Sequence, residues 1–391
     1  MSMIYLDHNA TTPPAPEVLR AVQETAALCW ANASSQHLLG QTARQRLGQA
    51  RATVARFLGC KPAEIVFTSG ATEANHLAVH GALARSGRRR LLVSAVEHAG
   101  LHRLARQLAD VRVDWMPVDA SGRLRLDAVP ALLDDGPRDE VALVSLMAAN
   151  NETGVLMPVA EVAALAHARG ALLHVDATQW VGKLDFDFRS AGADLVSLSA
   201  HKFHGPKGVG ALIVRQGLDW PAVVPGSQER GRRGGTENLP AIAGFAAAAE
   251  RLMAGESTVQ RAARITRLRD RLQQGLVRSL PGTVVYGATA PRLPNTLCLR
   301  FGPLSADRVL NRLDRLGVMA SSGAACASAG SEPSHVLTAM GVPRDEALGA
   351  VRLSLGDATT DAEVDAVLRA LAVELAPLMR EPMQETVAVP A

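Results

Sequence analysis

Strand-length runs of apolar residues alternate with helix-length segments through the first half of this chain. Several runs are nearly continuous in Val, Leu and Ile, as expected for strands that are covered on both faces. The alternation predicts an α/β domain with a mostly parallel sheet. The expected strands are residues 65–68, 90–96, 111–118, 141–147, 171–175, 195–198 and 210–214. The expected helices include residues 73–85, 101–108 and 159–169.

The pattern changes in the second half of the chain. Residues 239–280 are predicted to form one or two long helices, broken near Gly255. Short predicted strands follow at residues 283–286, 296–301 and 351–355. We therefore expect a large domain over residues 16–259 and a smaller α+β domain over residues 260–391, with residues 1–15 packed on the smaller one.

Composition excludes several classes of protein. The 391 residues carry a formal net charge of +3, from 41 basic and 38 acidic residues, which argues against a nucleic-acid or membrane partner. We expect the cluster Arg88-Arg89-Arg90 to be a solvated loop entering a strand. No secretory signal is visible in the first residues.

The four cysteines are far apart in the sequence and form no CxxC pair. They indicate neither an intrinsic metal site nor a disulfide framework, so a reducing cytoplasm is the expected location. Three of them lie in apolar surroundings and are expected to be core residues, namely Cys29, Cys60 and Cys298.

Two neighbouring apolar runs lead to groups of opposite charge. Residues 171–175 run into Asp176, and residues 195–198 are followed four positions later by Lys202. Strands that end side by side in these groups suit pyridoxal phosphate. The lysine amine forms a Schiff base with the cofactor aldehyde, and the carboxylate keeps the pyridine nitrogen protonated so that the ring accepts electrons.

The segment Ser69-Gly70-Ala71-Thr72-Glu73 follows a predicted strand and opens a predicted helix. Free backbone N–H groups and the helix dipole make such a turn an anion site. A simple helix cap is the alternative, and the segment matches neither GxxxxGK[ST] nor GxGxxG. Because Asp176 and Lys202 are also present, a cofactor phosphate is the preferred interpretation.

Two further apolar runs end near His98 and Asn151. Ligands of open α/β sheets collect at the carboxyl ends of the strands, so these residues suit the same ligand. A histidine there could lie over a cofactor ring and move protons, whereas a lone strand-end histidine is often an ordinary surface or core residue.

Cys326 is the one residue other than Ala, Ser or Gly between Ala320 and Ser331. A segment with so few anchoring side chains is expected to move, and an exposed thiol on it suits sulfur transfer. A small buried cysteine in a turn is the alternative. Arg352, in a predicted strand, needs an anion partner, which is either a substrate carboxylate or a structural ion pair.

Taken together, these motifs resemble cysteine desulfurases of the NifS/IscS type, which are fold-type-I pyridoxal phosphate enzymes of the class-V aminotransferase family. The resemblance runs from Tyr5 to about Thr360. It depends on FTSGATE from Phe67, HVDATQ from His174, HKFHGPKG from His201 and SSGAACAS from Ser321. The sequences around Asn151 and Thr236 are closer to the nitrogen-fixation (NifS) branch.

The resemblance implies roles for the residues that match. Lys202 would carry the Schiff base, Asp176 would pair with the pyridinium nitrogen, and His98 would stack on the ring and take part in catalysis. Gln179 and Asn151 would contact the ring on its hydroxyl side. The cofactor phosphate would be held by four residues, Ala71, Thr72, Ser199 and His201.

The resemblance also implies partners and a reaction. In the family a threonine of the second subunit reaches the phosphate, and Thr236 matches it, which implies a homodimer. Arg352 and Asn151 would bind the substrate carboxylate. Cys326 would carry a persulfide and could serve as a transient iron–sulfur ligand shared with a scaffold.

The implied function is a cysteine desulfurase, which converts L-cysteine to L-alanine and passes the sulfur on for iron–sulfur cluster assembly, including nitrogenase maturation. Another reaction on the same cofactor is an alternative, such as that of a selenocysteine lyase or an aminotransferase. A non-enzymatic sulfur-carrier scaffold is a third, but it would need several clustered cysteines.

Overall fold

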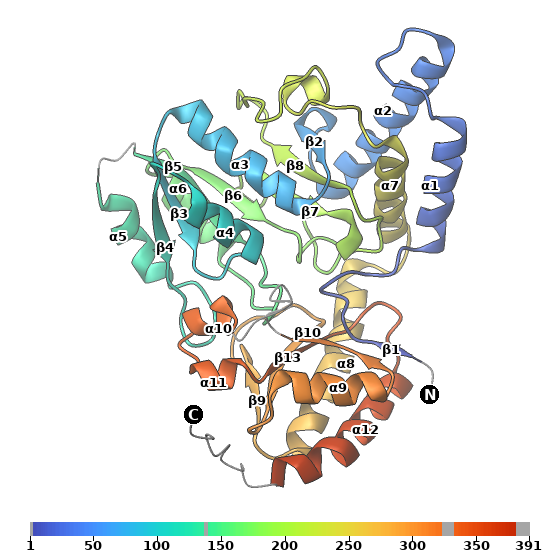
Figure 1. Cartoon of the computed structure of the whole chain (residues 1–391). Coiled ribbons are helices and arrows are strands. Elements are labelled where there is room, and N and C mark those ends of the chain that lie inside the picture. Colours follow the sequence, from blue (N-terminus) through green and yellow to red (C-terminus); the bar gives the residue numbers. More distant parts are fainter. Residues whose placement is uncertain (1–2, 137–139, 323–331, 381–391) are drawn as a thin grey trace, which may run out of the picture.

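A seven-stranded sheet forms the upper part of the molecule in Figure 1. The computed structural model describes residues 3–136, 140–322 and 332–380. The strand order is β2-β8-β7-β6-β5-β3-β4; β8 runs antiparallel to both neighbours, and the other pairs are parallel. The bounds are β2 (Ile65–Thr68), β3 (Arg90–Ser94), β4 (Arg112–Met116), β5 (Val141–Met147), β6 (Leu172–Asp176), β7 (Leu195–Ser199) and β8 (Gly210–Val214). The predicted α/β fold with a mostly parallel sheet is confirmed.

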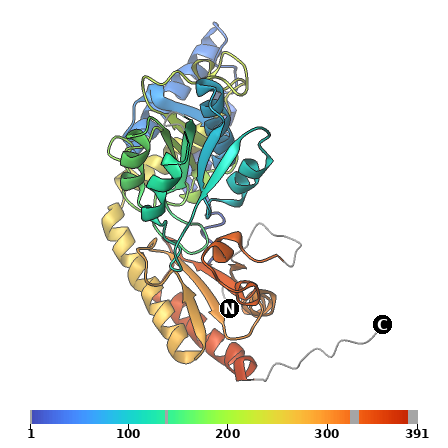
Figure 2. The ribbon, with the colours of Figure 1, turned by 90° about the vertical axis from the view of Figure 1, so that its left-hand side faces the viewer.

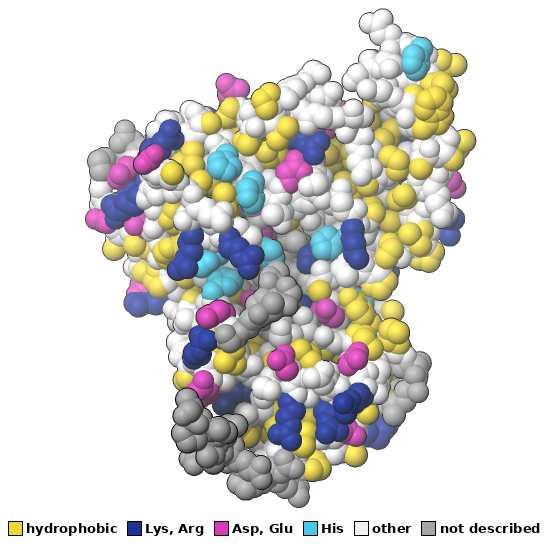
Figure 3. Space-filling view, viewed as in Figure 1, with side chains coloured by type: hydrophobic (Ala, Val, Ile, Leu, Met, Phe, Trp, Pro, Cys, Tyr) yellow, Lys and Arg dark blue, Asp and Glu magenta, His cyan; other side chains and the backbone are white. Residues whose placement is uncertain are grey.

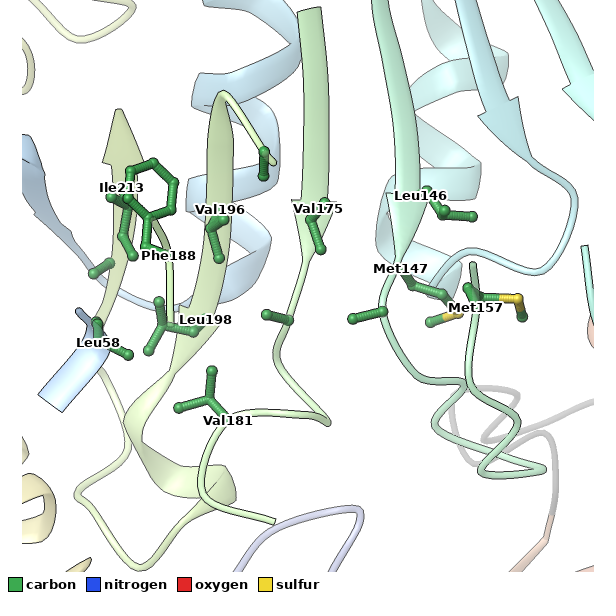
Figure 4. Close-up of a cluster of buried hydrophobic side chains, with 14 of the residues drawn as sticks. Leu58, Leu146, Met147, Met157, Val175, Val181, Phe188, Val196, Leu198 and Ile213 are labelled. Atoms are coloured by element: carbon green, nitrogen blue, oxygen red, sulfur yellow. The ribbon is translucent and has the colours of Figure 1, made fainter. Parts of the chain in front are cut away.

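Helices cover both faces of this sheet. Leu91 and Val93 pack in a cluster with α3 (Ala71–Ser86) and α4 (Ala99–Gln107), whereas Leu92 packs in the cluster of the other face. That second cluster joins strand side chains to residues of other helices, and Figure 4 shows Val175, Val196 and Leu198 within it. These helices are α1 (Pro16–Leu28), α2 (Leu38–Leu58), α5 (Val129–Asp134), α6 (Val159–His167) and α7 (Leu239–Ala254). Every strand of the middle of the sheet is therefore buried on both sides, which explains its continuous apolar sequence.

A smaller antiparallel sheet lies in the lower part of Figure 1. Its order is β12 (Ser321–Ser322), β13 (Ala350–Ser354), β10 (Thr296–Phe301), β9 (Thr283–Tyr286). Leucines of α8 (Thr258–Ser279) and α12 (Asp361–Arg380) form a separate core with this sheet, and Figure 2 shows α8 along one side. The remaining elements are α9 (Ala306–Arg315), α10 (His335–Ala339), α11 (Arg344–Ala347) and the parallel pair β1 (Ile4–Tyr5) and β11 (Val318–Met319). The predicted break near Gly255 is confirmed, because α7 ends at Ala254 and Ser257 caps α8.

Two smaller expectations were wrong. Arg90 is not part of a solvated loop: its side chain is fully buried, and its Nε and Nη2 donate to Asp114 Oδ2 (2.6 Å) and the main-chain oxygen of Leu132 (2.7 Å). The first residue of β3 thus reaches a carboxylate on the neighbouring strand β4. Cys60 and Cys298 are buried as expected, but Cys29 is half-exposed, because it lies just beyond the end of α1. Over the described ranges, no helix combines the length and apolarity needed to span a bilayer.

Candidate functional site

A cavity of about 640 Å³ opens at the carboxyl ends of the parallel strands. Histidine and basic side chains gather across the middle of the face in Figure 3, between the regions of the two sheets. The lining also includes the first turn of α3, the N-terminal segment around Asn9, and Arg352 of the smaller sheet. The structure brings together ten of the predicted residues on this cavity: Ala71, Thr72, His98, Asn151, Asp176, Gln179, Ser199, His201, Lys202 and Arg352.

Lys202 lies in a short 3₁₀ turn, Ala200–Lys202, that follows β7 directly. Its Nζ donates to the main-chain oxygens of Asn9 (2.7 Å) and Ala10 (2.8 Å). These two carbonyls belong to the N-terminal segment, so a distant part of the chain orients the amine. The amine is thereby held at the cavity wall rather than left on a free four-carbon chain.

Asp176 is the last residue of β6, and it lies opposite Ser197 of β7 in the sheet register. Its carboxylate is buried and accepts hydrogen bonds from Asn75 Nδ2 (2.9 Å) and from the main-chain N–H of Thr178 (3.0 Å). Both contacts fix the direction of the carboxylate. The parallel pairing of β6 and β7 explains why Asp176 and Lys202 face one cavity.

Glu97 is a second, fully buried acid close to Asp176. Burial and the charge of Asp176 raise the pKa of Glu97 well above its usual range. Glu97 therefore holds its proton more tightly than an exposed glutamate does, and its Oε1 accepts from the main-chain N–H of Met147 (2.5 Å). Of these two acids, Asp176 is the one that lines the cavity.

His98 caps the N-terminus of α4, where its Nδ1 accepts from the main-chain N–H of Gly100 (3.1 Å). Burial lowers the pKa of His98, so the imidazole is neutral near pH 7. A neutral ring whose Nδ1 accepts must carry its proton on Nε2. His98 thus offers one defined proton at the cavity rather than a full positive charge.

One end of the cavity suits an anion. The main-chain N–H of Ala71 in the first turn of α3 donates to Ser199 Oγ (2.8 Å), and Thr72 lines the same turn. Burial and the charges of Lys202 and Lys207 lower the pKa of His201 to about 4, so its ring is neutral. Lys207 also lines the cavity and supplies a positive charge. Helix N–H groups, a hydroxyl and an ammonium are the donors that a phosphate requires.

Arg352 forms a structural ion pair, which is one of the two interpretations that the sequence left open. Its side chain is 2% exposed and pairs with Asp7, at 2.8 Å from Nη2 to Oδ1. Its Nη1 donates to the main-chain oxygen of Asn151 (3.0 Å), while its buried Nε has no hydrogen-bond partner among the described residues. The guanidinium is therefore structurally anchored and still retains a donor for a ligand.

Two predicted residues are not on this cavity. Thr236 is exposed and lines a neighbouring cavity of about 190 Å³, which shares Ser69 and Gly208 with the first one. Cys326 lies outside the described residues. Their predicted roles, like those of the ten residues above, remain proposals.

Sequence reasoning missed several residues that hold the site together, namely Asp7, Asn9, Asn75, Lys183 and Lys207. One of them, Asn9, bonds to Lys202, Gln179 and Lys183 as well as to β10 and β13. The rarity of lysine in the sequence was a signal that could have pointed to Lys183 and Lys207. Of the 41 basic residues four are lysines, and three of these, Lys183, Lys202 and Lys207, lie on or directly behind this cavity.

Comparison with known proteins shows the family of this chain. The model of the family described as aminotransferase class-V matches residues 4–367. The chain belongs to this family. A relative named cysteine desulfurase, from Cereibacter sphaeroides, is 47% identical over 377 residues, which cover 95% of each chain.

Solved structures are similar over nearly the whole chain. A structure titled NIFS-like protein superposes with a TM-score of 0.86 at 35% identity and covers 96% of this chain and 99% of that one. A second, titled SspA in complex with cysteine, has a TM-score of 0.79 at 31% identity, with coverage of 91% and 100%. The NifS/IscS-type resemblance expected from the motifs is thereby confirmed.

Proposed function

We propose that this class-V protein is a cysteine desulfurase that uses pyridoxal phosphate to convert L-cysteine to L-alanine, with the sulfur kept as a protein persulfide. The observation that carries the proposal is the placement of Lys202 and Asp176 on one cavity by the adjacent parallel strands β6 and β7. Its support includes relatives that are named cysteine desulfurases and are up to 47% identical.

The donor set fits this cofactor at three points. The Lys202 amine lies on the cavity wall, where it would meet the aldehyde. The Asp176 carboxylate would face the pyridine nitrogen, and the turn at Ala71 with Ser199 would hold the phosphate. Thr72 and His201 complete that anion-binding end. When bound, pyridoxal phosphate supplies an aldehyde that joins amines and a ring that accepts electrons. Gln179 and Asn151 would contact the hydroxyl side of the ring.

The protein's own groups then position the amino acid and move its protons. Arg352 binds the substrate carboxylate through the donors that Asp7 leaves available, and Asn151 assists it. The Lys202 amine takes the Cα proton. His98, with its proton on Nε2, is the nearby group that returns protons.

Cys326 is proposed as the sulfur acceptor on the strength of the resemblance. Its thiolate attacks the sulfur of the substrate, so that an S–S bond forms as the substrate Cβ–S bond breaks. The electron pair of the broken bond remains on the carbon, which takes up a proton and becomes the methyl group of alanine. The thiol is oxidised to a persulfide and the carbon is reduced, so no external oxidant is needed.

We further propose a homodimer in the cytoplasm that delivers sulfur to an iron–sulfur scaffold, with nitrogenase maturation as one use. Thr236 is exposed beside the cavity, as a residue that serves a second subunit would be. Large apolar side chains are exposed around the α1–α2 connection, with Leu28, Trp30 and Leu38 each at least 71% exposed. Such a group of exposed apolar residues is typical of a protein–protein interface.

The test is to give the purified protein pyridoxal phosphate and L-cysteine, and to measure alanine and sulfide. Cys326→Ser should keep the colour of the bound cofactor and stop both products. Normal turnover by this variant would contradict the persulfide role. Faster turnover of selenocysteine than of cysteine would favour a selenocysteine lyase, and transfer of the amino group to a keto acid would favour an aminotransferase. Light scattering checks the dimer.

A further inference from the structure

Lys183 lies behind the wall of the cavity, in the turn that follows β6. Its Nζ donates to Asn9 Oδ1 (3.0 Å) and to Gln179 Oε1. It is not among the residues that line the large cavity, but it lines a smaller space on the other side of Lys202. Lys183 therefore touches two residues of the cavity wall without reaching the cavity itself.

The contacts of Gln179 determine which way its amide points. The amide nitrogen donates to the main-chain oxygen of Asn9 (2.9 Å), an atom that can only accept. The amide oxygen faces Lys183 Nζ, a donor. Lys202 Nζ donates to the same Asn9 oxygen, so the Gln179 nitrogen and the Lys202 amine lie around one acceptor. The second N–H of Gln179 is left for an acceptor in the cavity.

Asn9 cannot replace Lys183 in this arrangement. Its side-chain nitrogen is already committed to Thr296 Oγ1 (2.9 Å) and the main-chain oxygen of Asn151 (3.2 Å). Its side-chain oxygen accepts from Lys183 and from Asn295 Nδ2 (3.0 Å). Asn9 is thus fixed in orientation, and Lys183 ties the Gln179 oxygen to this fixed group.

The surroundings of Lys183 explain why a lysine stands here in a chain whose basic residues are mostly arginine. Burial, followed by the charges of Lys202 and Arg352, lowers the pKa of Lys183 well below the usual lysine range, and Asp357 opposes the shift. His8 and His201 are the other titratable groups that face it. An arginine would remain fully charged among these cations, whereas a lysine amine can shed its proton and still donate two hydrogen bonds.

We propose that Lys183 is a positioning residue, which holds the Gln179 side chain so that its amide nitrogen faces the cofactor. The inference rests on the proposed function, because it assigns the free N–H of Gln179 to the ring oxygen of pyridoxal phosphate. Lys183 itself touches neither cofactor nor substrate. It acts through Gln179, and its removal leaves a buried amide oxygen without a donor.

The test is a double-mutant cycle on the full-length protein with Lys183→Met, Gln179→Met and both together. Each is titrated with pyridoxal phosphate, and the dissociation constant and the absorption band of the Lys202 adduct are measured. Lys183→Met should weaken cofactor binding roughly tenfold, the size of one lost hydrogen bond, and shift the band. In the Gln179→Met background the same change should have no further effect.

Lys61→Met is the matched control, because Lys61 is exposed and bonds to Gln216 away from the cavity. It should match the unaltered protein in affinity and band. Additive effects in the cycle, or wild-type binding by Lys183→Met, would overturn the inference while the proposed function stands. Absence of cofactor binding by the unaltered protein would instead refute the proposed function. If Lys183→Met does not fold, wild-type affinity and band in Gln179→Met would overturn the inference.

Discussion

The two sheets contribute to the cavity in different ways. The seven-stranded sheet supplies groups from the ends of several strands, including Asp176 and the turn that carries Lys202. The four-stranded sheet supplies Arg352 from β13, through the ion pair with Asp7 and the contact with Asn151. We infer that the larger sheet holds the cofactor and that the smaller sheet holds the substrate.

This difference has a physical basis. Parallel strands all end at one edge, so their terminal residues converge without any long side chain. An antiparallel sheet places its strand ends at both edges, so one long arginine side chain must reach across to the cavity. Changes in the two regions should therefore have separable effects.

The largest effect is expected for Lys202→Ala. We expect complete loss of the visible absorbance of the bound cofactor and at least a thousandfold loss of alanine production, because the nucleophilic amine is absent. Absorbance spectra and an alanine assay measure both. An unchanged spectrum would refute the assignment of Lys202.

The next largest effects are expected when one buried side chain is truncated in each sheet, and they should distinguish the two sheets. Leu198→Ala in β7 and Leu299→Ala in β10 each remove a fully buried side chain, and each should lower the free energy of unfolding by roughly 2–5 kcal/mol. Leu198 directly precedes Ser199, so its loss should also weaken pyridoxal phosphate binding, whereas Leu299→Ala should not. Urea unfolding and cofactor titration measure both. Equal effects on cofactor binding would show that the two sheets are not separable.

The buried contact between Glu152 and Ser334 should make the stability of the protein depend on pH. Burial raises the pKa of Glu152 to about 7, and Ser334 Oγ donates to its Oε2 (2.5 Å). The folded protein therefore binds this proton more tightly than the unfolded chain does. Below about pH 4.5 Glu152 is protonated in both the folded and the unfolded protein, so its contribution to stability is fully present. As the pH rises from there through 7, the free energy of unfolding falls by roughly 3 kcal/mol.

Glu152→Gln should remove this pH dependence, so the variant gains stability relative to the unaltered protein between pH 5 and pH 8. Chemical denaturation at both pH values gives the two free energies of unfolding. Glu161→Gln, which changes an exposed carboxylate on α6, is the control and should leave the difference unchanged. Parallel behaviour of the two variants would contradict the assignment.

The smallest effect is expected for Arg352→Lys. The cation is kept but the two-pronged geometry is lost, so KM for L-cysteine should rise roughly tenfold while the cofactor absorbance stays. Arg300→Lys is the matched control on β10, where Arg300 pairs with Glu346 outside the cavity. Loss of cofactor colour in Arg352→Lys would show that the small sheet also holds the cofactor.

Much of the fold could be predicted because it depends on local pattern. The expected bounds of β2, β5, β8, β9 and β10 coincide with the observed ones. Asp176 and Lys202 could be paired in advance, because consecutive strands of an α/β sheet are usually neighbours. The position of β8 between β2 and β7, antiparallel to both, could not be predicted, since strand order is decided by non-local pairing.

The residues that support the site could not be predicted from local sequence patterns. Asn9 bonds to Ser354 Oγ, 345 positions away, and nothing in its neighbourhood indicates such a partner. The burial of Arg90 likewise depends on Asp114, which a different strand carries.

The sequence alone determined the class of fold and predicted the reacting groups, because apolar periodicity and residue chemistry are properties of short segments. The tertiary structure alone decided which groups anchor them: Asp7 anchors Arg352, and Asn9 anchors both Lys202 and Gln179. These anchors join segments that are distant in sequence, and a hydrogen bond forms only where folding has brought its donor and acceptor together.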